Sequence, residues 1–331
     1  METRTLGRTG LQVSALGFGC GAVGGLMVRG NPADQEQAVA RALELGINYF
    51  DTAAMYGNGE SERNLGRVIK SLKPAILVGT KVRVPASERG RIGAAVTASL
   101  EASLQRLQLD RVDLFQLHNH ITAEGIDSDL TPEIVLGEVV PAFERLREQG
   151  KTRFYGITAV GDTPALHQLA DARALDTAQV SYNVLNPSAG AIVASGYPAH
   201  DFGNLLAHTR AASTGVIAIR VLAAGALSGV EARHPLGSPS VEPIGSGSAY
   251  GIDVDRARRL EPLIRDGYAD SLIELAVRFV ISNEAVSTAL VGYSTLDHLE
   301  YAAAAVNKGP LPRETLERIA KLQNSFVGEA R

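Results

Sequence analysis

The fold class that this sequence predicts is α/β, with strands and helices in regular alternation. Eight short β-branched or apolar runs alternate with longer helical patterns along the chain. The runs are nearly continuous in apolar residues, which indicates parallel strands buried on both faces. An open doubly wound sheet has the same local pattern. The strand count and the length of 331 residues together favour a (β/α)8 TIM barrel, with a single domain over residues 1–331.

The eight strands are expected where apolar runs stand between helical patterns. They are predicted at 15–18, 47–51, 75–81, 112–118, 154–158, 178–182, 216–220 and 287–291. Residues 3–13 precede the first of them and contain the turn-forming sequence Arg8-Thr9-Gly10. We expect this segment to form an N-terminal hairpin that closes the bottom of the barrel.

The helices are expected from caps, apolar stripes and stop signals. Asn31 places a side-chain cap before Pro32, and proline suits the first position of a helix. An apolar stripe follows, and Gly46 is typical of a helix end. Further helical patterns span 60–72, 87–107 with Ser87 as the expected cap, 132–149, 163–174, 203–213, 270–281 and 295–307. A C-terminal extra helix at 313–326 has no strand after it.

Two stretches are expected to be long loops. Residues 119–131 follow the fourth strand, and residues 229–251 are rich in Gly, Ser, Pro and His. Long loops at the C-terminal rim of a barrel shape substrate pockets. With residues 20–30 they are the predicted walls of a pocket, although a disordered insertion is an equal alternative for 229–251.

Composition excludes several classes of partner. The chain has 32 Lys and Arg against 36 Asp and Glu, a formal charge of −4, so no basic surplus exists to neutralise nucleic-acid phosphates. The first ten residues lack the apolar core of a secretory signal, and no run reaches the ~18 apolar residues of a membrane span. The single Cys20 excludes an intrachain disulfide. We expect a cytoplasmic protein that acts on a small molecule; no feature predicts its oligomeric state.

Polar residues stand at the ends of three consecutive predicted strands. The second strand ends at Asp51 and leads to Tyr56, the third ends at Lys81, and the fourth ends at His118. Because the carboxyl ends of barrel strands gather around one mouth, we expect these four side chains to converge there. Each residue alone has a structural interpretation, such as a buried ion pair or a core histidine. Four together at one rim favour catalysis.

Their chemistry fits proton transfer to an oxygen. A tyrosine near its reference pKa of ~10 is a poor acid at neutral pH, and a neighbouring ammonium favours the phenolate and lowers that pKa. Lys81 would supply the ammonium, and Asp51 the counter-charge that a buried lysine needs. A histidine opposite would hydrogen-bond and orient a carbonyl oxygen. Together these groups would protonate an oxygen while a hydride reaches its carbon.

The sequence resembles the aldo-keto reductase family from about residue 4 to residue 304. The resemblance is carried by three segments, Gly-Ile-Asn-Tyr-Phe-Asp-Thr-Ala at 46–53 with Tyr56-Gly57, Gly-Thr-Lys at 79–81, and Asp-Leu-Phe-Gln-Leu-His at 113–118. It implies a barrel that binds a nicotinamide cofactor and reduces carbonyls reversibly. It also implies Tyr56 as acid and base, Lys81 as its polarising neighbour, Asp51 as the partner of the lysine, and His118 as the residue that orients substrate.

The resemblance also implies cofactor-binding residues, with departures from the family pattern. Gln179 matches the residue that binds the nicotinamide amide, and Thr158 matches a serine of the family. The asparagine usual beside it is Ala159 here. A stacking tyrosine of the family is replaced by Ile219, which is followed by Arg220 as a further cofactor candidate.

The last strand–helix junction, residues 291–298, resembles the adenosine-phosphate site of the family. A helix N-terminus with free N–H groups suits an anion. Gly292, Ser294 and His298 are the candidates there, with less positive charge than many members place at this site. The resemblance implies NADP as the cofactor, with NAD as the alternative.

Three features of the sequence suggest rival interpretations. Residues 19–24 spell the dinucleotide fingerprint Gly-x-Gly-x-x-Gly, but nearby glycines and Pro32 interrupt the helix that the fingerprint needs, so we expect a flexible first loop. Cys20 in that loop is expected to be an inert thiol. His118 and His120 are spaced for a metal-dependent hydrolase, although the later strand ends lack further ligands, so no metal is expected. A non-catalytic regulatory subunit that binds the cofactor is the second alternative.

Overall fold

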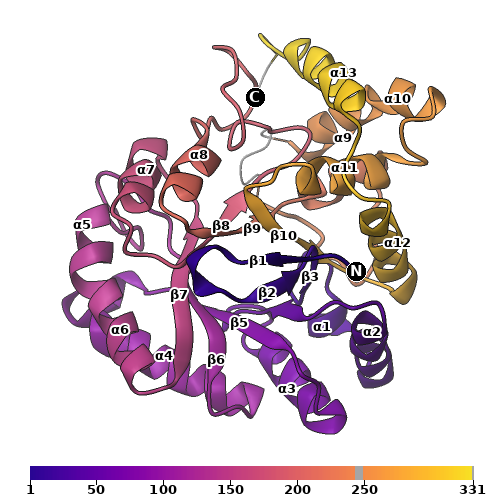
Figure 1. The fold of residues 1–331 in the computed structure, drawn as a ribbon. Coiled ribbons are helices and arrows are strands. Elements are labelled where there is room, and N and C mark those ends of the chain that lie inside the picture. The colour runs from indigo at the N-terminus through magenta and orange to yellow at the C-terminus, as the bar shows by residue number, and fades with distance from the viewer. Residues whose placement is uncertain (243–248, 330–331) are drawn as a thin grey trace.

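The computed structural model describes residues 1–242 and 249–329, and it has the predicted closed barrel (Figure 1). The eight barrel strands are all parallel and follow the order β10-β3-β4-β5-β6-β7-β8-β9, so neighbours along the chain are neighbours in the sheet. Each lies within two residues of its predicted bounds. The strands are β3 (Leu16–Gly19), β4 (Tyr49–Asp51), β5 (Leu77–Val82), β6 (Val112–Leu117), β7 (Thr152–Ala159), β8 (Thr177–Ser181), β9 (Gly215–Ile219) and β10 (Val286–Gly292).

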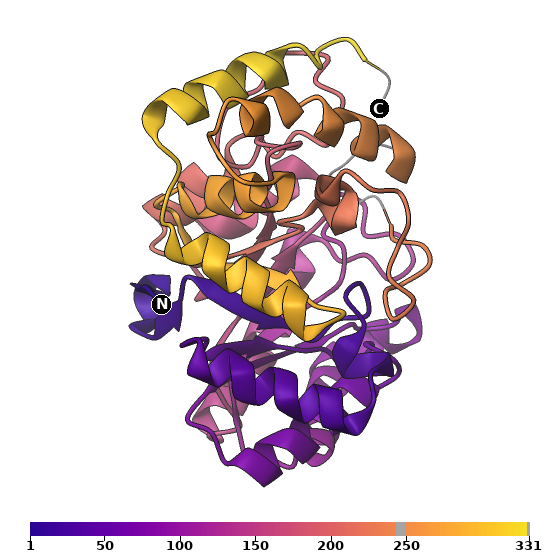
Figure 2. The same ribbon diagram turned by 90° about the vertical axis from the view of Figure 1, so that its right-hand side faces the viewer.

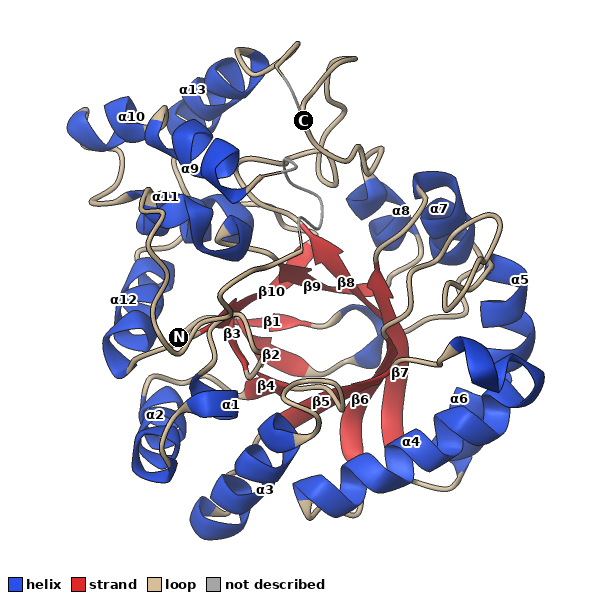
Figure 3. Cartoon of the chain, turned by 180° about the vertical axis from the view of Figure 1, so that it is seen from behind, coloured by secondary structure: helices blue, strands red, loops and turns tan. Residues whose placement is uncertain are grey.

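Helices surround the strands on the outside of the barrel (Figure 3). They are α1 (Leu26–Arg29), α2 (Pro32–Glu44), α3 (Glu60–Leu72), α4 (Ile92–Leu107), α5 (Pro132–Ile134), α6 (Val140–Glu148), α7 (Thr163–Asp171), α8 (Leu205–Ala211), α9 (Tyr250–Arg258), α10 (Glu261–Arg265), α11 (Leu272–Ile281), α12 (Leu296–Asn307) and α13 (Arg313–Asn324). A π-helical turn, Val135–Val139, joins α5 to α6. The predicted helix at 132–149 is therefore one helical segment of three parts.

The predicted N-terminal hairpin closes the bottom of the barrel. Strands β1 (Thr3–Thr5) and β2 (Gln12–Ser14) pair antiparallel and lie across the barrel opening (Figure 1). Leu6, Leu11 and Val13 pack in one apolar cluster with interior side chains of the barrel, including Leu114 and Ile217. This apolar plug leaves the opposite end, where the strands finish, as the open mouth.

One predicted cap is confirmed and one is wrong. The Asn31 side chain accepts a hydrogen bond from the backbone N–H of Asp34 at 2.9 Å, at the start of α2. Ser87, in contrast, lies in a 3-10 turn, Ala86–Arg91, and α4 begins only at Ile92 without a side-chain cap. The start of α4 therefore coincides with the first residue of the apolar stripe, Ile92, and not with Ser87.

The predicted loop 229–251 is partly wrong. Its C-terminal end enters α9 at Tyr250, and α9 and α10 were not predicted; residues 243–248 lie outside the described part of the chain. Residues 236 and 238 contact the segment that follows β3: Arg29 of α1 donates to the carbonyl of Leu236 at 2.7 Å, and Ser238 donates to that of Ala22 at 2.9 Å. This part is therefore held against the rim of the barrel.

The C-terminal helix α13 packs beside α9 and α10, away from the hairpin (Figure 2). The Arg259 guanidinium donates to the Ser325 hydroxyl at 2.8 Å, and Tyr268 donates to Glu314 at 2.8 Å. The extra helix α13 thus lies against α9 and α10, the two helices that were not predicted. Among the described residues, no helix has the length and the apolar character to cross a bilayer.

Candidate active site

The four predicted catalytic side chains come from three adjacent strands. Asp51 ends β4, Lys81 is near the end of β5, and His118 directly follows β6. Tyr56 lies in the turn that leads from β4 to α3. Because parallel strands of a barrel finish at the same rim, the local sequence order places all four at one mouth.

Lys81 is the centre of the cluster. Its ammonium forms an ion pair with Asp51 and donates to the carbonyl of Thr52 at 2.8 Å and to the Tyr56 hydroxyl at 3.2 Å. An ammonium has three N–H donors, so all of them are used. The side chains of Lys81 and Asp51 are only 1% and 2% exposed, and therefore this charge pair is shielded from water.

The pKa of the Tyr56 phenol differs from the sequence-based expectation. Burial raises this pKa, Lys81 lowers it, Asp51 raises it, and Arg220 lowers it, with a net shift above the usual value of 10. The contribution expected from the neighbouring ammonium is present, but desolvation of the phenolate outweighs it. In the free protein Tyr56 is therefore a protonated phenol that two cations help to ionise.

His118 faces Tyr56 as a neutral imidazole. The two rings are perpendicular, with centroids 6.1 Å apart. Burial lowers the pKa of His118 to about 3, and the charges of Lys81 and Arg83 add to this effect. Its Nδ1 is buried and has no hydrogen-bond partner in the described part of the chain. The ring can therefore hydrogen-bond a ligand oxygen at neutral pH without carrying charge.

Two of the predicted cofactor residues lie directly beside this cluster. The Thr158 hydroxyl donates to Gln179 Oε1 at 3.3 Å, and Gln179 Nε2 donates to Asp51 Oδ2 at 2.6 Å. Both side chains are buried. The amide of Gln179 therefore joins the predicted cofactor residues to the carboxylate that holds Lys81.

Arg220 is placed at the same mouth. It follows β9 with a left-handed backbone (φ 57°), its side chain is partly buried, and its charge acts on Tyr56. Glu242 is an acidic neighbour whose charge acts on Arg220. Within residues 1–242 and 249–329 the guanidinium forms no hydrogen bond or ion pair, and only the backbone carbonyl of Arg220 is engaged, accepting from Asn183 at 2.9 Å.

The three candidates at the β10–α12 junction have different surroundings. Ser294 is buried, and its hydroxyl donates to the carbonyl of Gly24 at 2.6 Å, which fixes the first loop to the junction. Gly292 is exposed at the end of β10. His298 is in the first turn of α12, where its backbone N–H donates to the Thr295 cap at 3.3 Å. Burial and His234 lower the pKa of His298.

The glycine-rich segment 19–24 is a loop, as expected. The chain leaves β3 at Gly19, and α1 is only four residues long. A Cβ on Gly24 would lie 2.4 Å from the backbone nitrogen of Tyr293, so this glycine permits close contact with the β10–α12 junction. Burial raises the pKa of the Cys20 thiol, which keeps it protonated and unreactive.

The predicted metal alternative finds little support in the geometry. Asn119, between the two histidines, exchanges hydrogen bonds with the backbone of Val84, its Oδ1 and Nδ2 each at 2.8 Å. Across residues 1–242 and 249–329, no group of three His, Cys, Asp or Glu side chains is placed to hold a metal ion. The His118–His120 pair therefore lacks a third ligand in that part of the chain.

One side chain at this site was not predicted. The hydroxyl of Tyr49 donates to Asp51 Oδ2 at 2.8 Å. The signal was present in the sequence, because residues 49 and 51 of one strand point to the same side. An interior tyrosine two residues before the aspartate is therefore in reach of its carboxylate.

Comparison with known proteins agrees with this geometry. The sequence model described as "Aldo/keto reductase family" matches residues 15–324. L-galactose dehydrogenase of Arabidopsis thaliana is 30% identical over 318 residues, which cover 93% of this chain and 89% of that protein. The chain therefore belongs to the aldo/keto reductase family, as its motifs predicted, and this is a class of oxidoreductases that act on carbonyls with a nicotinamide dinucleotide.

Solved structures show the same fold. The holo form of an aldo-keto reductase from Bacillus halodurans has a TM-score of 0.72 and 26% identity, with 97% of this chain and 96% of that chain covered. An aldo/keto reductase from Klebsiella pneumoniae, solved with NADP and acetate, has a TM-score of 0.69 and 23% identity over 98% and 96% of the two chains. The second likeness is one of fold alone.

Proposed function

We propose that the protein reduces an aldehyde, ketone or open-chain sugar at its carbonyl, with NADPH as the hydride donor, and that Tyr56 is the proton donor. The observation that carries the proposal is the 3.2 Å hydrogen bond between the Lys81 ammonium and the Tyr56 hydroxyl, with the lysine held by Asp51. A protonated phenol beside a fixed cation can release its proton because the phenolate that forms is stabilised at once.

The residues present fit a nicotinamide dinucleotide. Gln179 and Thr158 offer an amide and a hydroxyl at the mouth, which match the hydrogen-bonding groups of a carboxamide. Arg220 offers a guanidinium without an ion-pair partner in the described residues, which suits phosphate oxygens. Gly292, Ser294 and His298 would line the adenosine side. When bound, the cofactor supplies a hydride to the carbonyl carbon.

The side chains at the mouth would orient the substrate and transfer the proton. His118, which is neutral, would hydrogen-bond the carbonyl oxygen and hold it near the Tyr56 hydroxyl. Tyr56 would give its proton to that oxygen, and the Lys81 ammonium would stabilise the phenolate left behind. Asp51 keeps the lysine charged and in place. In the reverse direction the phenolate would take the proton from an alcohol.

The test is Tyr56→Phe, which removes the proton donor and leaves the ring. We expect turnover to fall by roughly 100- to 10,000-fold, the range of general acid–base catalysis, while the dinucleotide Kd from isothermal titration calorimetry stays within about twofold of wild type. Retained turnover in this variant would overturn the role of Tyr56.

Cofactor preference is tested separately. We propose NADP because a fold neighbour was solved with it; residues 292–302, however, contain neither Lys nor Arg, which favours NAD as the alternative. Comparison of kcat/KM for NADPH and NADH decides between the two. Tight dinucleotide binding without turnover on any aldehyde or sugar would instead favour a regulatory cofactor-binding subunit.

A further inference from the structure

The phenol of Tyr49 lies inside the barrel, next to Asp51. Its side chain is fully buried, and its hydroxyl donates to Asp51 Oδ2 at 2.8 Å. The other carboxylate oxygen, Oδ1, takes the Lys81 ammonium. Tyr49 therefore contacts the carboxylate through the oxygen that the lysine does not use.

The strands on both sides of β4 make room for this ring. A Cβ on Gly79 of β5 would lie 2.7 Å from the Tyr49 hydroxyl, and a Cβ on Gly17 of β3 would lie 3.2 Å from its ring. Both distances are closer than side chains normally pack. Glycine at these two positions therefore allows the tyrosine to reach Asp51, and the neighbouring strands hold the ring in place.

A second donor shares the same oxygen. Gln179 Nε2 donates to Asp51 Oδ2 at 2.6 Å, but Gln179 is also proposed to bind the cofactor amide. A side-chain amide nitrogen has two N–H donors, so the bond to Asp51 competes with cofactor contacts for the orientation of Gln179. Tyr49 has no such second role, and its hydrogen bond persists whichever way the amide turns.

We propose that Tyr49 is a positioning residue for the reaction: its hydroxyl fixes the Asp51 carboxylate and disperses its charge, so that Lys81 stays aligned with Tyr56. This inference rests on the proposed function. A carboxylate that loses a hydrogen-bond donor attracts the ammonium more strongly, and its negative charge opposes ionisation of Tyr56 more strongly. Removal of the Tyr49 hydroxyl is therefore expected to raise the pKa of Tyr56.

The other titratable and charged groups near Tyr56 and Asp51 should not mask a change in the pKa of Tyr56. Tyr56 is influenced by Lys81, Asp51 and Arg220, and it faces the neutral His118. Asp51 is also close to the Cys20 thiol, whose pKa burial raises. A change in the pH profile at alkaline pH then reports on the Tyr56–Lys81 pair.

The experiment is Tyr49→Phe in the full-length protein with NADP(H), with Tyr155→Phe as the matched control. Tyr155 is also a buried strand tyrosine whose hydroxyl meets a carboxylate, Glu144 Oε1 at 3.3 Å, but it is not part of the mouth cluster. For Tyr49→Phe we expect about a tenfold lower kcat, the effect of one hydrogen bond to a charged group, with KM and dinucleotide Kd within about twofold. The alkaline limb of kcat for carbonyl reduction, where Tyr56 must be protonated, should move to higher pH. Tyr155→Phe should change neither quantity.

A second variant separates positioning from simple stability. Gly79→Ala leaves the tyrosine intact but crowds its hydroxyl, and it should also lower kcat and shift the alkaline limb. Unchanged kcat in a folded Tyr49→Phe protein, checked by thermal melting, would overturn the proposal, and so would a lower kcat with an unshifted limb. Wild type and Tyr56→Phe run in the same assay: an inactive wild type rejects the proposed function, whereas an active wild type with normal Tyr49→Phe rejects only this inference.

Discussion

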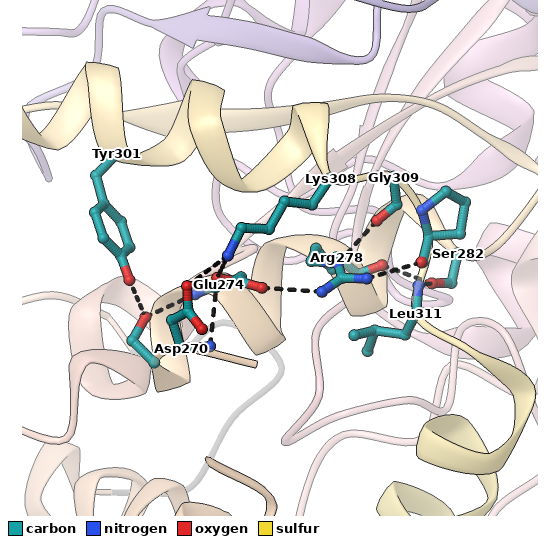
Figure 4. Close-up of polar contacts among 10 residues, drawn as sticks. Asp270, Glu274, Arg278, Ser282, Tyr301, Lys308, Gly309 and Leu311 are labelled. Atoms are coloured by element: carbon teal, nitrogen blue, oxygen red, sulfur yellow. Dashed lines mark hydrogen bonds and ion pairs between the residues drawn. The ribbon is translucent and has the colours of Figure 1, made fainter. Parts of the chain in front are cut away.

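Asp51 and Glu274 are both buried carboxylates that hold cations, and their surroundings differ. Asp51, at the mouth of the barrel, pairs with Lys81. Glu274, on α11 at the outside, accepts from Arg278 at 2.9 Å and from Lys308 at 2.6 Å (Figure 4). Its Oε2 therefore joins α11 to the end of α12, while its Oε1 pairs with Arg278 within α11.

The outer cluster is closed by further contacts. Lys308 also meets Asp270 at 2.6 Å, and Arg278 donates to the carbonyl of Gly309 at 2.9 Å (Figure 4). Its lysine is 43% exposed, whereas Lys81 is 1% exposed. The charged groups around Glu274 connect helices and are partly exposed to water. At the mouth, by contrast, the third N–H of Lys81 points to the phenol of Tyr56, which can lose its proton. Similar ion pairs thus serve stability in one place and are available for chemistry in the other.

The largest effect is expected for Lys81→Met. Loss of one partner leaves Asp51 as a buried unpaired charge, which costs about 3–5 kcal/mol of unfolding free energy, and turnover should fall by at least about 1,000-fold. Denaturant unfolding and steady-state kinetics measure the two losses. The double variant Asp51→Asn/Lys81→Met should recover most of the stability and none of the turnover; recovery of both would show that the pair is only structural.

A smaller effect that falls on stability alone is expected for Glu274→Gln. This change keeps the shape but removes charge-assisted hydrogen bonds, so the unfolding free energy should fall by about 1.5–3 kcal/mol, with kcat within about twofold of wild type. Glu317→Gln is the control, because its exposed pair with Arg313 should contribute less than about 1 kcal/mol. A marked loss of kcat in Glu274→Gln would contradict the inference that the Glu274 cluster serves stability and only the Asp51–Lys81 pair serves catalysis.

The smallest effect is expected on acidification. The pKa of His118 is lowered to about 3, so the imidazole is neutral at any pH above about 4, unlike an ordinary histidine with a pKa of ~6.5. The rate of carbonyl reduction should therefore change less than about twofold between pH 5.5 and pH 7.5. A change in the rate of carbonyl reduction near pH 6.5 that is absent in His118→Asn would instead show that this histidine titrates between pH 5.5 and pH 7.5.

Local sequence signals predicted most of the fold. Apolar runs located all eight barrel strands within two residues, because burial on both faces leaves a continuous apolar segment. They did not predict α9, whose polar residues carry little helical periodicity, or α10, which has only five residues. Ser87 was a wrong cap, since a serine can stabilise a turn as well as a helix start.

The candidate site was predicted in its residues but only partly in its energetics. Asp51, Lys81 and Tyr56 converge as expected because strand ends share one rim. The expected fall in the pKa of Tyr56 was wrong in its net direction, because the degree of burial depends on the surrounding elements and not on adjacent sequence. The bond from Gln179 to Asp51 joins residues 128 positions apart, and no local pattern encodes such a contact.

The sequence by itself determined the alternation of strands and helices, the order of the polar strand ends and the family to which the chain belongs, because these follow from periodicity and from short motifs. Closure of the barrel decided the rest. It brought β8 and β4 together across the interior, so that Gln179 and Tyr49 meet on one oxygen of Asp51. It also removed water from Lys81 and Tyr56. Distances and desolvation are properties of packed neighbours, and only the folded chain supplies them.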